Sequence, residues 1–139
     1  MLLRLLSKEE RVEMKDIVKE LDIRILHVGI NASGGDDAKR LADELSSKLG
    51  FVSRDAGLSI FSSGLIEIMK EDGPGEKGHI AFGCNNLEKA IELVSSLGVH
   101  VDESLTRKYD PIGELRVAYL DTQIGGFAFH FKEYPKKLT

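Results

Sequence analysis

The sequence lacks tryptophan, contains a single cysteine, Cys84, and has no long run of apolar residues. One cysteine excludes an internal disulfide and a cluster of thiolates, so a metal site would have to be built from histidine and carboxylate side chains. The first ten residues, MLLRLLSKEE, lack the longer apolar stretch and the small-residue cleavage site of a signal peptide. We therefore expect a soluble, cytoplasmic protein with no membrane partner.

An excess of positive charge is also absent. The chain has 19 basic and 23 acidic residues, a net charge of -4 and a pI near 5.6. Such a surface offers no cationic field to hold a phosphate backbone, so nucleic acid is not an expected partner. The 139 residues suffice for one domain with one core.

The first 21 residues carry leucine, isoleucine, valine and methionine at a spacing close to the helical period, with charges between them. We predict an amphipathic helix over residues 1–21, followed by one domain over residues 22–139. The apolar face of this helix must be covered by the rest of the domain or by a second copy of the chain. Cover by the same domain is slightly favoured, and we separately expect a homodimer.

The order of the predicted elements repeats on either side of a linker, residues 71–78, which holds three glycines and a proline. The first half, residues 22–72, reads as a strand, a helix and three short strands, VSRDA, LSIFSS and LIEIMK. The second half, residues 78–134, reads as GHIAFGC, a helix, and the strands HVDESL, ELRVAYLD and GGFAFHFKEY, with RKYDPIG as a wide loop. Half a sheet cannot bury both itself and its helix, so the two βαβββ modules should form one α+β domain around a pseudo-twofold axis.

Alternation of side chains along the strands places polar residues on one face, opposite the bulky ones. His27, His79 and His130 lie mid-strand among mostly small neighbours, and Glu67 lies mid-strand between two isoleucines. A lone histidine of this kind is usually a hydrogen-bonded structural residue, and a mid-strand carboxylate is costly unless it is paired or binds an ion. Four such residues on equivalent strands predict a divalent metal site, with zinc, nickel, manganese, cobalt or iron as candidates.

The remaining candidates are less specific. Arg116 and Tyr119 lie on a strand that could border the cavity, and either could bind an anionic substrate, although their opposite parity prevents both from facing it. We expect His100 on the surface and Cys84 as a buried, inert thiol. The chain has neither a dinucleotide fingerprint nor a nucleophile elbow.

Several segments together resemble the vicinal oxygen chelate superfamily: HVGI in the first strand, LGF after the first helix, IE in the fourth strand, GHIAF at the start of the second half and GGFAFHF near the end. This superfamily includes glyoxalase I, methylmalonyl-CoA epimerase, extradiol dioxygenases and the fosfomycin and bleomycin resistance proteins. The stretches ILHVGIN, IEIMK, GHIAFG, KYD and AYLDTQIGGFAFHF are most similar to the glyoxalase-like domain appended to some bacterial 2-keto-3-deoxy-phosphogluconate and 4-hydroxy-2-oxoglutarate aldolases. The chain is too short for the (β/α)₈ barrel of such an aldolase.

The resemblance covers residues 22–134 and implies a glyoxalase-like fold with metal ligands at His27, Glu67, His79 and His130. His130 stands where glyoxalase I and the epimerases usually have a glutamate, which leaves Glu67 as the only carboxylate for proton transfer. The implied activity is that of an isomerase or lyase, in which the ion binds two adjacent oxygens of a small 2-oxo or 2-hydroxy acid and stabilises the enolate formed on proton loss.

A non-catalytic metabolite-binding or regulatory module of the same fold is the alternative. Aromatic residues make up only 6% of the chain, which disfavours a pocket that stacks a flat drug.

Overall fold

Two central strands, β1 (Arg24–Asn31) and β5 (Gly78–Cys84), run antiparallel and join the halves of the sheet. Strand β4 (Ile66–Met69) pairs in parallel with β1, and β8 (Phe127–Glu133) pairs in parallel with β5. The outer strands are β3 (Ser59–Ser62) and β2 (Ser53–Asp55) in the first half, and β7 (Glu114–Ile124) and β6 (Arg107–Tyr109) in the second. The sheet order is therefore β2-β3-β4-β1-β5-β8-β7-β6.

This computed structural model describes residues 5–109 and 114–135, with the side chains of 107–109 and 114–116 excluded. Each half is a βαβββ module, with α2 (Gly35–Leu49) after β1 and α3 (Leu87–Ser96) after β5. The two halves have the same strand order outward from β1 and β5, which confirms the predicted α+β fold of two tandem modules. In the described part of the chain, no helix is long and apolar enough to cross a membrane.

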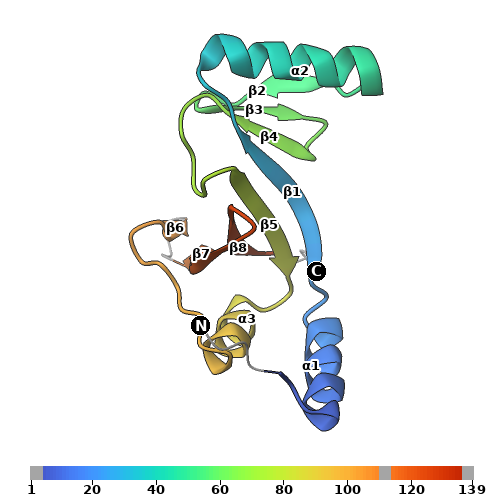
Figure 1. The fold of residues 1–139 in the computed structure, drawn as a ribbon, viewed down its shortest axis with the longest axis vertical. Helices are drawn as coiled ribbons and strands as arrows, with labels where there is room; N and C mark the ends of the chain where they lie inside the picture. The colour runs from blue at the N-terminus through green and yellow to red at the C-terminus, as the bar shows by residue number, and fades with distance from the viewer. Residues whose placement is uncertain (1–4, 110–113, 136–139) are drawn as a thin grey trace.

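The helices lie at opposite ends of the molecule. Figure 1 shows α2 beside β2, β3 and β4 at one end, and α3 beside α1 (Lys8–Glu20) at the other. Beneath α2 the core consists of alanines and isoleucines: Ala32, Ala38, Ala42, Ile60 and Ile68. The second core lies beneath α3 and holds Leu21, Cys84, Leu87, Ala90, Ala118 and Phe131.

The predicted helix boundaries follow from local chemistry. Helix α2 carries Asp36 and Asp37 in its first turn, where the macrodipole favours negative charge. It is followed by Gly50, which caps the helix in the left-handed conformation with a φ of 73°. The Asn86 side chain accepts a hydrogen bond from the Lys89 backbone N–H and caps α3.

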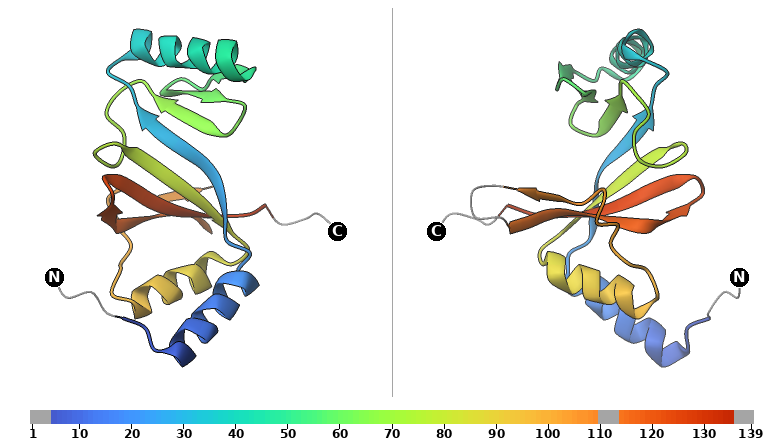
Figure 2. Two further views of the ribbon diagram at one scale, coloured as in Figure 1. Left: turned by 45° about the vertical axis from the view of Figure 1, so that its right-hand side comes forward. Right: turned by 90° about the vertical axis from the view of Figure 1, so that its left-hand side faces the viewer.

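The first helix is shorter than predicted. It begins at Lys8, because Ser7 and Glu10 form a capping box in which each side chain accepts a hydrogen bond from the backbone N–H of the other. Ile17, near its end, packs with Leu21 against the core beneath α3, whereas Val12 is 58% exposed. Figure 2 shows α1 lying alongside α3, so part of its apolar surface is covered by its own domain.

The prediction for the first strand after α3 was wrong. Residues 100–105 contribute only one isolated bridge, between Val101 and Leu120, and the strand β6 lies at residues 107–109, within the predicted loop. The chain turns at Asp102, whose carboxylate accepts hydrogen bonds from the Ser104 backbone N–H and hydroxyl, and whose carbonyl accepts from Thr106. An aspartate that bonds its own following backbone in this way favours a turn over a strand.

Candidate metal centre

Three potential ligand atoms converge on one face of the sheet. The Nε2 atoms of His27 and His79 lie 3.3 Å apart, and Glu67 Oε1 lies 3.0 Å from His79 Nε2 and 3.5 Å from His27 Nε2. Within the described residues, these three side chains form the group whose ligand atoms all lie within 4.8 Å of one another. They come from β1, β4 and β5, so both modules contribute to the group.

The strand register explains this convergence. Gly29 of β1 lies opposite Glu67 of β4 and His79 of β5, so the two side chains flank a residue that has no side chain of its own. The His79 ring occupies this vacant position. A Cβ atom added at Gly29 would come 2.0 Å from His79 Cε1 and 2.2 Å from His79 Nδ1. Gly29 is thus what allows His79 to reach the other two residues.

Glu67 is held by both of its carboxylate oxygens. Its Oε1 faces the two histidines, and its Oε2 accepts a hydrogen bond of 2.8 Å from the Ser59 hydroxyl of β3. Burial raises the pKa of the Glu67 carboxyl, but hydrogen bonds with His27, His79 and Ser59 outweigh this and leave the pKa below its usual range. Glu67 is therefore ionised at neutral pH.

His130 lies beside this group on β8. Its ring centroid is 5.7 Å from that of His27, 5.5 Å from that of His79 and 4.5 Å from that of Tyr119. Burial, and next the neighbouring His79 and His27, lowers the pKa of the His130 imidazole to about 3, so this histidine is neutral at neutral pH. His130 is outside the convergent group of three, and its role as a fourth ligand stays a prediction.

The geometry and the donor set fit a small divalent ion. A triangle with sides of 3.0, 3.3 and 3.5 Å has a circumradius of about 1.9 Å, close to the metal–nitrogen and metal–oxygen distances of about 2.0–2.2 Å at zinc sites. The Nδ1 atoms of His79 and His130 are buried without a hydrogen-bond partner in the described structure. Two imidazoles and a carboxylate form a donor set that suits zinc, iron and other first-row metals.

A cavity of about 370 Å³ opens over the three residues. Its polar lining residues are His27, Ser59, Glu67, His79, Tyr119, His130 and Lys132, and its apolar ones are Ala56, Leu58, Phe61, Met69, Pro74, Leu105 and Val117. Of Arg116 and Tyr119, which could not both face the cavity, Tyr119 is a lining residue. Arg116 lies on β7, but its side chain is outside the described residues.

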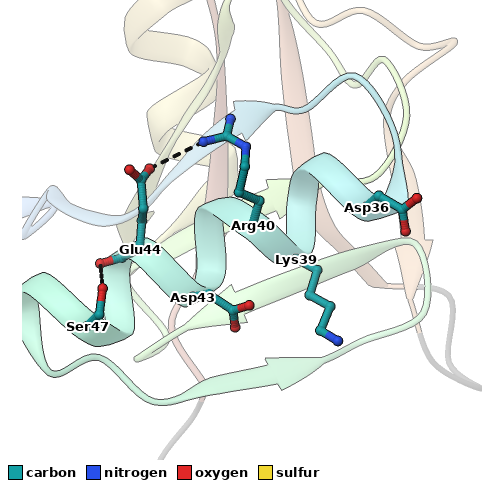
Figure 3. A pocket seen from close by; sticks show the side chains of 6 residues that line it. All are labelled: Asp36, Lys39, Arg40, Asp43, Glu44 and Ser47. Atoms are coloured by element: carbon teal, nitrogen blue, oxygen red, sulfur yellow. Dashed lines mark hydrogen bonds and ion pairs between the residues drawn. The ribbon is translucent and has the colours of Figure 1, made fainter.

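The other predicted residues lie elsewhere. His100 is exposed, and Cys84 is fully buried on the opposite face of the sheet, where burial raises the pKa of its thiol to about 11. A separate depression runs along the outer face of α2 (Figure 3). It is lined by side chains of that helix alone, and Arg40 pairs there with Glu44 at 3.5 Å, so its charges are those of a solvated helix face.

Ser59 and Lys132 were not predicted as site residues. Ser59 lies two residues before Phe61, and Lys132 two residues after His130, so the parity used for the histidines also places them on the cavity side. Serine and lysine are mostly found on the surface, so this parity alone did not mark them as cavity residues.

No protein-family model matches the chain, and no curated protein matches it in sequence. Several solved structures share its fold. A hypothetical protein from Bacillus halodurans has a TM-score of 0.58 and 18% identity, over 84% of this chain and 98% of its own.

Two further similar structures are named enzymes. The methylmalonyl-CoA epimerase of Mycobacterium tuberculosis has a TM-score of 0.55 and 15% identity, over 81% of this chain and 88% of its own. A variant of homoprotocatechuate 2,3-dioxygenase from Brevibacterium fuscum has a TM-score of 0.53 and 13% identity, over 84% of this chain and 33% of its own. At such low identity these similarities concern the fold alone: the chain has a glyoxalase-like fold built from two βαβββ modules.

Proposed function

We propose that this chain binds one divalent metal ion through His27, Glu67 and His79, and that the bound ion holds two adjacent oxygens of a small 2-oxo or 2-hydroxy acid. The observation that carries the proposal is the convergence of three ligand atoms within 3.5 Å of one another at the base of a cavity. An ion held there would act as a Lewis acid toward the oxygens of the acid.

The residues around the three ligands have separate tasks. Ser59 holds the Oε2 atom of Glu67, so that Oε1 is the oxygen directed at the two histidines. Phe61 contacts the edge of the His27 ring with ring centroids 5.6 Å apart, which restricts the orientation of that ligand. His130, neutral and next to Tyr119, would complete the ligand set or line the cavity with a polar ring.

The fold resemblance favours proton transfer beside a carbonyl, with Glu67 as the base, as in an isomerase or lyase. Glu67 is a weak base in this arrangement, because hydrogen bonds to both of its carboxylate oxygens lower its pKa. This observation favours the second candidate function, a metabolite-binding or regulatory module that holds the acid without turnover.

Elemental analysis of protein purified without a histidine tag or a chelator tests the metal site. We expect about one equivalent of a divalent metal in the wild type, loss of the metal in His27→Ala and His79→Ala, and retention in His100→Ala, a matched histidine that is exposed outside the cavity. Wild-type protein that is metal-free and takes up no added ion would refute the proposal. Retention of the metal in His79→Ala would refute it as well.

Hydrogen exchange in heavy water separates the two candidate functions. The metal-loaded protein is incubated with a series of 2-oxo acids, and loss of the proton beside the carbonyl is followed by NMR. Exchange above the protein-free rate, abolished in Glu67→Gln, indicates an enzyme. Binding of the acid with no accelerated exchange indicates the binding module.

A further inference from the structure

Internal duplication gives most residues of the cavity a counterpart in the other half. Relative to the central pair β1 and β5, Glu67 of β4 corresponds to His130 of β8, since the two strands occupy equivalent places in the sheet. The residue two positions further along is Met69 in β4 and Lys132 in β8, and both line the cavity. These equivalent positions of the cavity therefore carry a thioether in the first half and an ammonium group in the second.

Lys132 has no ion pair or hydrogen bond within the described part of the chain. Lys70, by contrast, is neutralised by Asp55 at 2.9 Å. The strand partner of Lys132 in β7 is Val117, so no acidic residue lies directly opposite it in the sheet. Lys132 is an exposed residue whose side chain borders the cavity, so its ammonium group is available to a ligand there.

The charges of the proposed metal, its ligands and Lys132 indicate which charge a bound acid should carry. A divalent ion, the single negative charge of Glu67 and two neutral imidazoles leave one net positive charge at the centre. The carboxylate of a chelating 2-oxo acid cancels that charge, so the positive charge of Lys132 remains. A second negative charge on the ligand would pair with it, whereas a methyl group at that end would leave it uncompensated.

We propose that the ligand is a small 2-oxo or 2-hydroxy acid with a second carboxylate, and that Lys132 binds this second carboxylate. The inference rests on the proposed function, because the first carboxylate needs the metal. Met69 and Leu58, which line the cavity in the first half, would disfavour the reversed orientation, in which the distal carboxylate would lie against a thioether and an aliphatic side chain. Lys132 is thus a specificity residue for the length and charge of the ligand.

Calorimetric titration of the metal-loaded protein with two acids of equal chain length tests this inference. The probes are 2-oxopentanoate and 2-oxopentanedioate, which differ only in a terminal methyl group and a terminal carboxylate. The variants are Lys132→Met and a matched control, Lys89→Met, in which an exposed lysine of α3 outside the cavity makes the same change of charge. Metal content is measured for each sample before titration.

We expect the wild type and Lys89→Met to bind the dicarboxylate about fivefold or more tightly than the monocarboxylate, the size expected for a partly exposed ion pair. In Lys132→Met this preference should disappear, while the affinity for the monocarboxylate stays the same. Equal affinities for the two acids in metal-loaded wild type, or an undiminished preference in Lys132→Met, would overturn the inference and leave the metal site intact. Absence of metal from the wild type would instead refute the proposed function, and the inference with it.

Discussion

Replacing Gly29 with alanine should remove the metal site while leaving the fold in place. The added Cβ would lie 2.0 Å from His79 Cε1, 2.2 Å from Nδ1 and 2.6 Å from Nε2, whereas carbon atoms in contact are separated by about 3.5–4.0 Å. The ring must therefore move by about 1.5 Å, far more than the tolerance of about 0.2 Å in a metal–ligand distance. Gly29 lies outside the glycines with positive φ, so its backbone conformation suits alanine.

The size of the effect follows from the loss of one ligand in three. Mutations of residues that only orient a ligand typically cost 10–100-fold in metal affinity, so displacement of His79 itself should cost about 100-fold or more. The free energy of unfolding should fall by about 1–3 kcal/mol, as is usual for overpacking at a buried position. Metal affinity is measured by competition with a chromogenic chelator, and stability by urea denaturation of the apoprotein.

Gly83→Ala is the matched control. Its Cβ would lie 2.2 Å from Cε1 of Tyr134, so the substitution also displaces an aromatic ring packed over a glycine of β5. Tyr134 is not a ligand in the proposed site, and we expect Gly83→Ala to bind metal with wild-type affinity. Wild-type metal affinity in Gly29→Ala, or an equal loss in both variants, would refute the argument that Gly29 positions His79.

Three further predictions concern Ser59, Cys84 and Ser7. Ser59→Ala removes the hydrogen bond to Glu67 Oε2 and should lower metal affinity about tenfold, whereas Ser62→Ala, a buried serine of the same strand whose Oγ has no partner in the described structure, should leave it unchanged. Burial raises the pKa of the Cys84 thiol to about 11, so the unfolded thiol loses its proton first and stability should fall as pH rises from about 8.5 toward 11. Urea denaturation across this range should show that decline in the wild type and a smaller one in Cys84→Ala. Ser7→Ala removes the capping box and should destabilise α1 by about 1 kcal/mol, measured as faster amide exchange in this helix with no change in α2.

The repeat made most of the fold predictable. The match of GHIAFGC to LHVGINA placed β1 and β5 correctly, and glycine or asparagine at the ends of the helices marked α2 and α3. Strand β6 was missed because it depends on a turn at Asp102, where side-chain hydrogen bonds outweigh the β-propensity of the preceding valine. The start of α1 was missed for a similar reason, since the capping box of Ser7 and Glu10 makes Lys8 the first residue of the helix.

Strand parity predicted which residues share the cavity face but not how close they come. His27, Glu67, His79 and His130 all line the cavity, as the alternation indicates. Their separations depend on register and rotamers, which place ligand atoms of three of them within 3.5 Å of one another and leave His130 outside that group. Parity also places Ser59 and Lys132 on the cavity face, but their roles could not be predicted, because these arise from a neighbouring strand and from asymmetry between the two halves.

The boundary between β1 and β5 is also the boundary between the two copies of the internal repeat. His27 and Glu67 belong to the first copy and His79 to the second, so neither copy alone carries the convergent set. An ion bound by all three resists separation of the copies, and at a free concentration of 100 times its dissociation constant it would add about 2.7 kcal/mol to the free energy of unfolding. The repeat thus brings the three residues together across this boundary, and a metal bound there as proposed would act as a noncovalent link between the two copies.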